Sequence, residues 1–375
     1  MKLCIVTRSV FKGDGQGRVN YEIVCEAIRR GYQVTIVSDS LAPDLQQKQN
    51  IRWVPILVKR YPTQLLSNMV FSRRVAAWLH KHRSEFDLVQ VNGGSTSAIA
   101  DINTVHFVHS SWLQSPAHII HQRRDFYGAY QWFYTCVNAF WEKTILRRTK
   151  VVLAVSEKVK QELIEINIPE NAIHVILNGV DLEEFFPGSG DRQSLNLPLG
   201  KPLALFAGDI RTNRKNLDTV LQAMMQVPEL HLAVVGNTTG STYPQLAEKL
   251  KLGGRVHFLG YRRDLPDVMR AADFFVFPSR YEPFGMVVTE AMASGLPVII
   301  TASAGAAEVV TPDCGIVLPD PEDSGALAQA LLYLTQNVDQ RKQMGQAARA
   351  IAKNHSWSSK AKSYINLFEE LKSPH

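Results

Sequence analysis

The chain has 375 residues, of which 45% are hydrophobic and 20% are charged, so it is long enough for two domains and too apolar to be disordered. Its net charge is +6, and the first 186 residues carry most of it, with 22 Lys and Arg against 17 Asp and Glu. A charge this modest and unclustered argues against nucleic-acid binding. The basic excess would attract an anionic acceptor or an anionic membrane face, and a solvated basic surface explains it equally well.

The cysteines and the apolar runs indicate an intracellular protein. Cys4, Cys25, Cys136 and Cys314 are scattered and read as reduced thiols. The apolar run at residues 2–7 is too short for a signal peptide, and no stretch of about 18 apolar residues predicts a spanning helix. We therefore expect a cytoplasmic protein, with peripheral contact at the inner membrane face through its basic first half as an option.

In the first half, short apolar runs alternate with helical patterns. Strands are expected at Leu3–Thr7, Val34–Ser38, Leu88–Val91, Thr104–Val108, Val151–Val155 and Val175–Leu177, and helices at Val19–Arg30, Ser72–His82 and Glu157–Glu165. This alternation predicts a parallel, doubly wound α/β sheet.

The segment Tyr127–Trp141 is rich in aromatic residues and lies between the basic pairs Arg123-Arg124 and Arg147-Arg148. A helix of this composition can lie on a membrane. Packing in a core or an interface is the more common use of such aromatics.

A second α/β pattern follows the turn-rich segment 187–200, which is predicted to be a linker. Strands are expected at Leu203–Ala207, His231–Val235, Val256–Leu259, Phe274–Phe277 and Val298–Thr301, and helices at Leu217–Met225, Met286–Ala293 and Ser356–Leu371. The predicted domains are 1–186 and 201–355, and the final segment, 356–375, is a helix that crosses back to the first domain. Two such domains create a cleft for a ligand.

The most informative stretch runs from Pro278 to Val298, where a strand, a turn and a helix follow one another. Free N–H groups at the helix start can bind sugar hydroxyls or phosphate oxygens. Glu282 in the turn can accept from a hydroxyl, and Glu290, one turn inside the helix, can hold a ribose diol. Taken alone, the two glutamates could instead cap the helix and pair with a lysine.

The whole string, with Glu-Pro-Phe-Gly, a second Glu, Ala-Met-Ala and Gly-x-Pro-Val in register, resembles the Glu-x7-Glu signature of the retaining glycosyltransferases of family 4. Residues 155–157, 178–181, 259–261 and 271–273 resemble further blocks of that family. The resemblance implies the GT-B fold, an α/β architecture of two Rossmann-like domains whose parallel sheets face each other across a cleft. It also implies retaining transfer of a sugar from a UDP- or GDP-sugar to a hydroxyl of a glycan or lipid-linked acceptor.

Site residues follow from the resemblance, position by position. The catalytic residues would be His109, Lys215 and Glu282. The donor-binding residues would be Gly15, Gly17, Arg211, Lys215, Tyr261, Arg262, Glu282, Phe284, Gly285, Met286, Val287 and Glu290.

The basic loop at residues 206–217 supplies the leaving-group cation. Lys215 has the reach and charge suited to a diphosphate. The family places an Arg directly after the glycine that corresponds to Gly208. This chain has Asp209 there, so Arg211 or Arg214 would supply the missing guanidinium. The alternative, a basic loop that is merely solvated, fits Arg214 better than Lys215.

Two features of the first domain complete the expected site. In the loop at residues 13–18 the family has Gly-Gly where this chain has Asp14 and Gly15, so Gly15 would face the donor phosphate. His109, at the expected end of the strand Thr104–Val108, fits the family histidine beside the sugar. His106 would be a core histidine, since residues three apart on a strand face opposite sides.

No Asp-x-Asp occurs in the chain, so we expect no metal and no cofactor beyond the nucleotide sugar. Basic side chains and N–H groups would neutralise the leaving group. A nucleotide-sugar epimerase or hydrolase of the same fold, or a non-catalytic sugar-nucleotide sensor, is the alternative function. A dehydrogenase is disfavoured because the dinucleotide glycine fingerprint is incomplete.

Overall fold

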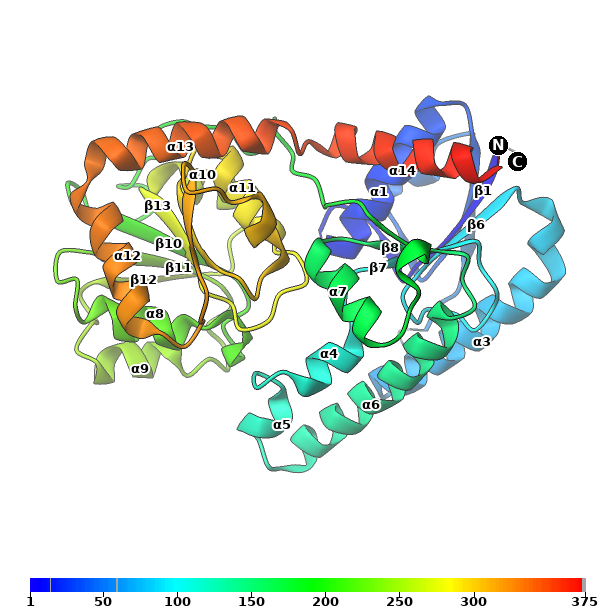
Figure 1. Cartoon of the computed structure of the whole chain (residues 1–375), viewed down its shortest axis with the longest axis horizontal. Helices are drawn as coiled ribbons and strands as arrows, with labels where there is room; N and C mark the ends of the chain where they lie inside the picture. The colour runs from blue at the N-terminus through cyan, green and yellow to red at the C-terminus, as the bar shows by residue number, and fades with distance from the viewer. Residues whose placement is uncertain (14, 59, 373–375) are drawn as a thin grey trace. The chain divides into compact units, whose positions relative to one another are not determined.

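A computed structural model describes residues 1–13, 15–58 and 60–372. The chain forms two compact units (Figure 1). Unit 1 contains residues 1–114, 123–179 and 357–375, and unit 2 contains residues 115–122 and 180–356. Each unit is built around one parallel sheet with helices packed on it.

The sheet of unit 1 has the strand order β5-β3-β1-β6-β7-β8-β9, with every neighbouring pair parallel. The strands are β1 (Lys2–Val6), β3 (Gln33–Ser38), β5 (Ile51–Pro55), β6 (Leu88–Asn92), β7 (Ile102–Val105), β8 (Val151–Ala154) and β9 (Ile173–Val175), and β2 (Ser9–Val10) pairs separately with β4 (Ser40–Leu41). The inner strands are buried throughout because helices cover both faces of such a sheet.

The helices of unit 1 come from both ends of the chain. They are α1 (Gly15–Arg29), α2 (Pro43–Gln46), α3 (Gln64–His82), α4 (His109–Gln114), α6 (Phe126–Leu146), α7 (Glu157–Glu165) and α14 (Trp357–Lys372). The last of these, α14, packs on α1. Arg30 after α1 pairs with Glu369 of α14 at 2.9 Å and donates to Asn366 at 2.7 Å. The C-terminal helix therefore completes the N-terminal unit.

The sheet of unit 2 has the order β12-β11-β10-β13-β14-β15 and is also parallel. Its strands are β10 (Leu203–Ala207), β11 (His231–Val235), β12 (Val256–Gly260), β13 (Phe274–Phe277), β14 (Val298–Thr301) and β15 (Gly315–Leu318). Its helices are α5 (Ile119–Gln122), α8 (Leu217–Met224), α9 (Tyr243–Lys249), α10 (Leu265–Ala271), α11 (Met286–Ala293), α12 (Ser324–Gln336) and α13 (Val338–Lys353).

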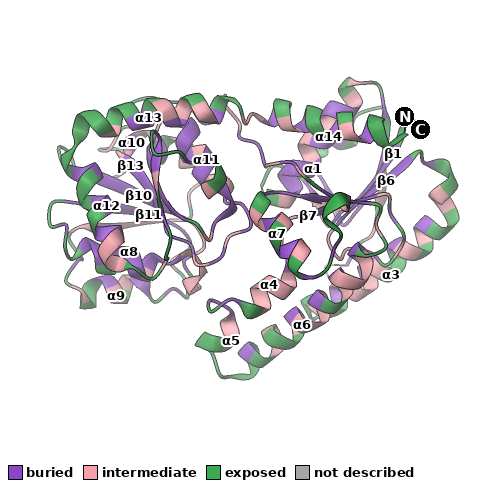
Figure 2. Cartoon of the chain, in the orientation of Figure 1, coloured by how far each residue is buried: buried purple, intermediate pink, exposed green. Residues whose placement is uncertain are grey.

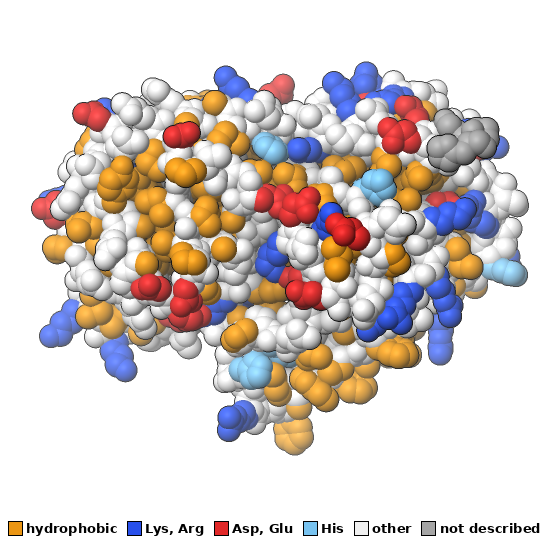
Figure 3. All heavy atoms as spheres, viewed as in Figure 1, with side chains coloured by type: hydrophobic (Ala, Val, Ile, Leu, Met, Phe, Trp, Pro, Cys, Tyr) orange, Lys and Arg blue, Asp and Glu red, His pale blue; other side chains and the backbone are white. Residues whose placement is uncertain are grey.

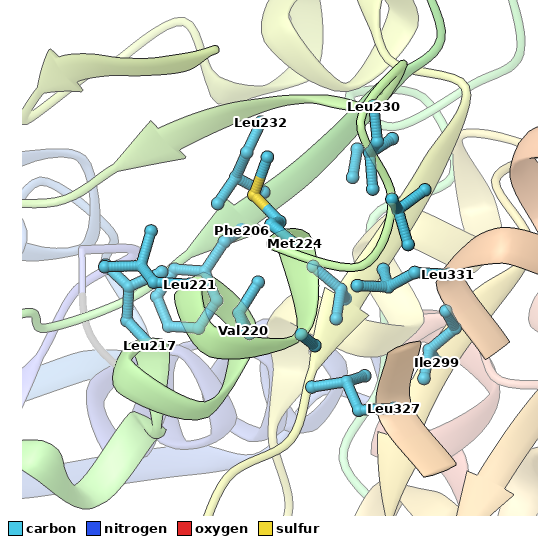
Figure 4. Close-up of a cluster of buried hydrophobic side chains, with 14 of the residues drawn as sticks. Phe206, Leu217, Val220, Leu221, Met224, Leu230, Leu232, Ile299, Leu327 and Leu331 are labelled. Carbon is cyan, nitrogen blue, oxygen red and sulfur yellow. The ribbon is translucent and has the colours of Figure 1, made fainter. Parts of the chain in front are cut away.

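The core of unit 2 lies between the sheet and the helices α8 and α12. Phe206 from the central strand packs there with Leu217, Leu221 and Leu327 (Figure 4), and all four are fully buried. Figure 2 shows that the strands are buried and that the outer faces of the helices are exposed. A rigid sheet of this kind fixes the loops at its edge, and two of those loops carry the candidate site.

Most predicted elements of unit 2 are confirmed, including Leu203–Ala207, His231–Val235, Phe274–Phe277, Val298–Thr301 and the helix Met286–Ala293. In unit 1, α3 begins at Gln64, eight residues before the predicted start, and the predicted strand Val175–Leu177 lies at Ile173–Val175 instead. The segment 187–200, expected to be a linker, lies inside unit 2, where Leu195 and Leu197 are buried. Arg192 holds this segment by pairing with Asp273 at 3.0 Å.

Candidate functional site

Because all strand pairs of unit 2 are parallel, the carboxyl ends of its strands lie at one edge of the sheet. Lys215 follows β10, Tyr261 follows β12 and Glu282 follows β13. The fold therefore brings these residues, which are far apart in the sequence, to the same edge.

The loop between β13 and α11 is held in one conformation by its neighbour after β14. The Glu282 N–H donates to the Ser303 carbonyl at 3.2 Å, and the Gly305 and Ala306 N–H groups donate to the carbonyls of Glu282 and Phe284 at 3.0 and 2.7 Å. Gly285 has a φ of 99°, a conformation that L side chains rarely adopt, and a Cβ there would lie 3.2 Å from the Glu282 Cγ. Helix α11 begins at Met286, so the first N–H groups of α11 have no acceptor within the helix.

Lys215 and Glu282 are in direct contact. The Lys215 ammonium donates to the Glu282 carboxylate and lies 4.7 Å from the centre of the Phe277 ring. Burial lowers the pKa of Lys215 well below its ordinary value, and the Arg214 guanidinium lowers it further. The carboxylate in contact favours the charged lysine instead. The geometry is that of a fixed cation beside a carboxylate that can accept a hydrogen bond from a hydroxyl group.

The two arginines proposed to replace the family guanidinium lie in different surroundings. Arg211 is bound in a bidentate pair by Asp209, at 2.8 and 2.9 Å. Arg214 has its Nη1 3.6 Å from the Glu282 Oε2, and burial lowers its pKa. Arg214 is thus the more exposed of the two neighbouring cations, at 27% against 12% for Lys215, but its guanidinium still lies beside Glu282.

Two residues that the sequence did not single out hold this arrangement together. Asn216 is fully buried with a φ of 64°, and its amide donates to the carbonyls of Pro278 and Pro321 at 2.9 and 2.6 Å. Arg280 pairs with Asp218 at 2.7 Å and with Glu322 at 2.5 Å, and it donates to the Asn213 carbonyl at 2.8 Å. These contacts tie the loop of Lys215 to the loop of Glu282.

The other predicted donor residues of unit 2 lie as follows. Glu290 is half-buried on α11, one turn from the helix start. Phe284 is buried, while Met286 and Val287 are half-buried in the first turn. Tyr261 is exposed after β12, and Arg262 beside it pairs with Asp264 at 2.5 Å.

Unit 1 contains a pocket of about 160 Å³ at the ends of β1, β6 and β7, and most of the residues that line it have polar side chains. His109 lines it, and the buried Glu142 of α6 holds this histidine. The carboxylate accepts from the His109 N–H at 2.9 Å and lies 3.4 Å from the ring Nδ1. Glu142 therefore orients His109, and no sequence pattern had linked the two residues.

His106, predicted to be a core histidine, also lines this pocket. The strand β7 ends at Val105 and not at Val108, and His109 is the first residue of α4, so strand alternation does not relate the two histidines. The His106 Nε2 lies 3.1 Å from the Asn92 Oδ1, and burial lowers the His106 pKa to about 4. His106 is therefore a neutral ring at physiological pH.

The glycine-rich loop leads into α1, which begins at Gly15 and includes the buried Gly17. Asp14 lies outside the described residues. Gln16 between the glycines lines the same pocket as His109, and its amide donates to the Thr7 Oγ1 at 3.1 Å. The start of α1 and the predicted histidine thus share one pocket.

Within residues 1–13, 15–58 and 60–372, no three His, Cys, Asp or Glu side chains are grouped so as to hold a metal ion. In the same part of the chain, every helix is too short or too polar to cross a membrane.

Known proteins resemble this chain in sequence and in fold. The profile described as "Glycosyltransferase Family 4" matches residues 13–184, and that described as "Glycosyl transferases group 1" matches residues 189–351. The chain is 31% identical over 246 residues to the D-inositol 3-phosphate glycosyltransferase of Xylanimonas cellulosilytica, across 61% of this chain and 59% of that protein. This chain thus spans little more than half the length of that curated relative.

Solved structures share the fold over the whole chain. Sucrose-phosphate synthase from Thermosynechococcus elongatus has a TM-score of 0.81 at 22% identity, covering 99% of this chain and 98% of its own. Anabaena HepE in complex with UDP and glucose has a TM-score of 0.76 at 20% identity, covering 99% and 100%.

Two α/β units with parallel sheets, and the Glu-x7-Glu string at the edge of the second, define the class of the GT-B glycosyltransferases. Both profiles match, and between them they span most of the chain. The chain belongs to glycosyltransferase family 4.

Proposed function

We propose that this protein transfers a sugar, with retention of anomeric configuration, from a UDP- or GDP-sugar to an acceptor hydroxyl. The observation that carries the proposal is the contact between Lys215 and Glu282 at the start of α11. This contact brings together a fixed cation for a diphosphate, a carboxylate that can accept hydrogen bonds from sugar hydroxyls, and the first N–H groups of the helix. The complex of Anabaena HepE with UDP and glucose supports a nucleotide-sugar donor of this kind.

In this proposal, Lys215 and Arg214 bind the diphosphate. Glu282 and the first N–H groups of α11 bind the sugar hydroxyls. Glu290 binds the ribose diol. The bond between the anomeric carbon and the phosphate oxygen breaks, and its electron pair leaves with the diphosphate. The acceptor oxygen forms the new bond on the same face, and its proton passes to a diphosphate oxygen. The family resemblance assigns His109 of unit 1 to the same reaction, and its ring is oriented by Glu142.

The stereochemistry of the product tests this mechanism directly. Glu282 is already used as a hydroxyl acceptor and is paired with Lys215, so it is not a free base for an attack on the opposite face. An α-linked donor is therefore expected to give an α-linked product. Proton NMR of the purified product reads the anomeric coupling for sugars with an axial proton at carbon two. A β product would overturn the mechanism and leave the fold untouched, and turnover without an acceptor would favour the epimerase or hydrolase.

Replacing Glu290 with alanine is expected to weaken binding of the nucleoside diphosphate by roughly 1–3 kcal/mol, the scale of a hydrogen bond to a charged group. Calorimetry with UDP and with GDP measures the change without any turnover. Glu248→Ala, an exposed glutamate of α9, is the matched control. Unchanged affinity in Glu290→Ala would remove the ribose assignment.

Full activity is expected in excess EDTA, because two basic side chains, Lys215 and Arg214, are positioned to neutralise the leaving diphosphate. Initial rates before and after chelation measure this, with back-addition of magnesium and manganese as the control. A loss of activity that either metal restores would contradict a metal-independent reaction.

We also propose a cytoplasmic location. The four cysteines are free thiols in the structure, two of them buried, which suits a reducing compartment.

A further inference from the structure

One side of α6 exposes large aromatic side chains. Phe126, Phe133 and Phe140 are 97%, 53% and 71% exposed. They are seven residues apart, so they lie on the same side of the helix. Figure 2 shows exposed residues along α6, and Figure 3 shows hydrophobic side chains gathered where Figure 1 places this helix. We call these three residues the phenylalanine stripe.

Both ends of the stripe are basic. Residues 123–150 contain six Lys and Arg and two acidic residues. Of the two acids, Asp125 pairs with Arg123 at 2.6 Å and Glu142 is buried against His109. Arg124 and Arg147 are exposed, and within the described part of the chain no carboxylate pairs with them. The exposed side of α6 is therefore aromatic along its length and positively charged at its ends.

A cavity of about 280 Å³ opens between α6 and α3, next to the stripe. Its apolar lining includes Met69, Ile99, Trp141 and Ile145, and two arginines, Arg73 and Arg148, also line it. Thr144 lines the cavity four residues after Phe140, so the two are neighbours on the helix surface. Neither arginine has a carboxylate partner among the described residues. The cavity therefore combines large apolar side chains with two positive charges suited to an anionic group.

Charge decides which occupant suits this surface. A second copy of the chain would bring the basic ends of one α6 against the basic ends of another, in either orientation, and like charges repel. An anionic lipid bilayer offers negative headgroups to the arginines and an apolar boundary to the phenylalanines.

We propose that unit 1 docks on an anionic lipid bilayer through the phenylalanine stripe, and that the cavity between α3 and α6 takes the apolar part of a lipid-borne acceptor. Only the identification of the cavity's occupant as an acceptor rests on the proposed glycosyl transfer. Phenylalanine side chains enter the boundary between headgroups and acyl chains, and the terminal arginines bind lipid phosphates.

The inner side of α6 connects this surface to the candidate site. Tyr134, Asn138 and Glu142 face the His109 pocket, and Gly94 lines both that pocket and the cavity between α3 and α6. A lipid chain in the cavity therefore places its head toward His109. One helix meets the bilayer on its outer side and orients the histidine on its inner side.

Vesicle flotation of the full-length protein, without donor, tests the docking. Binding is expected to vesicles of phosphatidylcholine containing about 30% phosphatidylglycerol, to fall with added salt, and to be weak on phosphatidylcholine alone. The triple variant Phe126→Ser, Phe133→Ser and Phe140→Ser is expected to bind at least about tenfold more weakly. The double variant Arg124→Glu and Arg147→Glu is expected to lose the preference for anionic vesicles.

The matched control changes three exposed apolar residues of unit 2, in the variant Leu199→Ser, Met225→Ser and Val338→Ser, and is expected to bind like the wild type. Thermal melts establish that each variant folds. Equal vesicle binding by the wild type and the stripe variant would overturn the proposal. A wild-type dimer that the stripe variant converts to a monomer would assign the surface to self-association and overturn it as well.

The cavity has its own test. Ala98→Trp, which adds a large ring to the lining, is expected to lower the affinity for soluble dihexanoyl-phosphatidylglycerol at least about tenfold and to leave UDP affinity unchanged. An unchanged lipid affinity would remove the cavity from the proposal. Vesicle binding with no sugar transfer would overturn the proposed function alone, and sugar transfer with no vesicle binding would overturn this inference alone.

Discussion

Replacing Lys215 with alanine is expected to lower kcat by about 10²- to 10³-fold, the loss seen when one fixed stabiliser of transition-state charge is removed. The Lys215 side chain is 12% exposed and is fixed between the Glu282 carboxylate and the Phe277 ring, so its charge needs no reorganisation as the diphosphate leaves. Ground-state binding is expected to change less, because the negative charge on the leaving oxygen grows during the reaction. Steady-state kinetics with saturating acceptor give kcat, and calorimetry gives the donor affinity.

Lys201→Ala, an exposed lysine of the same unit, is the matched control and is expected to leave kcat unchanged. Thermal melting checks that loss of the contact with Glu282 does not unfold unit 2. Turnover within about threefold of the wild type in folded Lys215→Ala would transfer the leaving-group role to Arg214, whose guanidinium lies beside the same carboxylate.

Glu282→Gln is expected to lower kcat/KM for the nucleotide sugar about 10- to 100-fold, which corresponds to roughly 1.5–3 kcal/mol for a charged hydrogen bond. The amide has the same shape, and the backbone bonds of Glu282 to Ser303 and Gly305 remain. Affinity for the nucleoside diphosphate alone is expected to stay the same or to rise, since Lys215 and Arg214 lose an anion that competes with the diphosphate.

These opposite directions make the Glu282 prediction specific. A merely structural loss would weaken binding of the sugar nucleotide and the free diphosphate together. Glu229→Gln, on an exposed loop of unit 2, controls for the loss of one negative charge. A parallel fall in both affinities would remove Glu282 as the residue that binds the sugar.

The string around Glu282 was predictable because its signals are local. A buried apolar strand, Pro283 and Gly285 in the turn, and a helical run after Met286 specify strand, loop and helix within about twenty residues. The bounds of β13 and α11 match that expectation. Placing Lys215 at the same edge as Glu282 needed only the parallel order of the sheet.

The residues that fix the geometry were not predictable, because their partners are distant in the sequence. Asp218 and Glu322, whose carboxylates pair with Arg280, are 62 and 42 residues away from it. Glu142 is 33 residues from His109. The role of Arg214 depended on the bidentate pair that binds Arg211 to Asp209, which only the folded loop establishes. The end of β7 at Val105 likewise needed its register against β6 and β8.

The packing of α14 on α1 has a consequence for the order of folding. The main segment of unit 2, residues 180–356, begins and ends side by side, where the Val180 N–H donates to the His355 carbonyl at 2.8 Å, so this segment is an insertion within unit 1. During synthesis the whole insertion is made before α14. The surface of α1 that packs on α14 therefore stays uncovered until α14 has been made. In this chain the N-terminal unit is the last to be finished, the reverse of the usual order in which domains mature from the N-terminus.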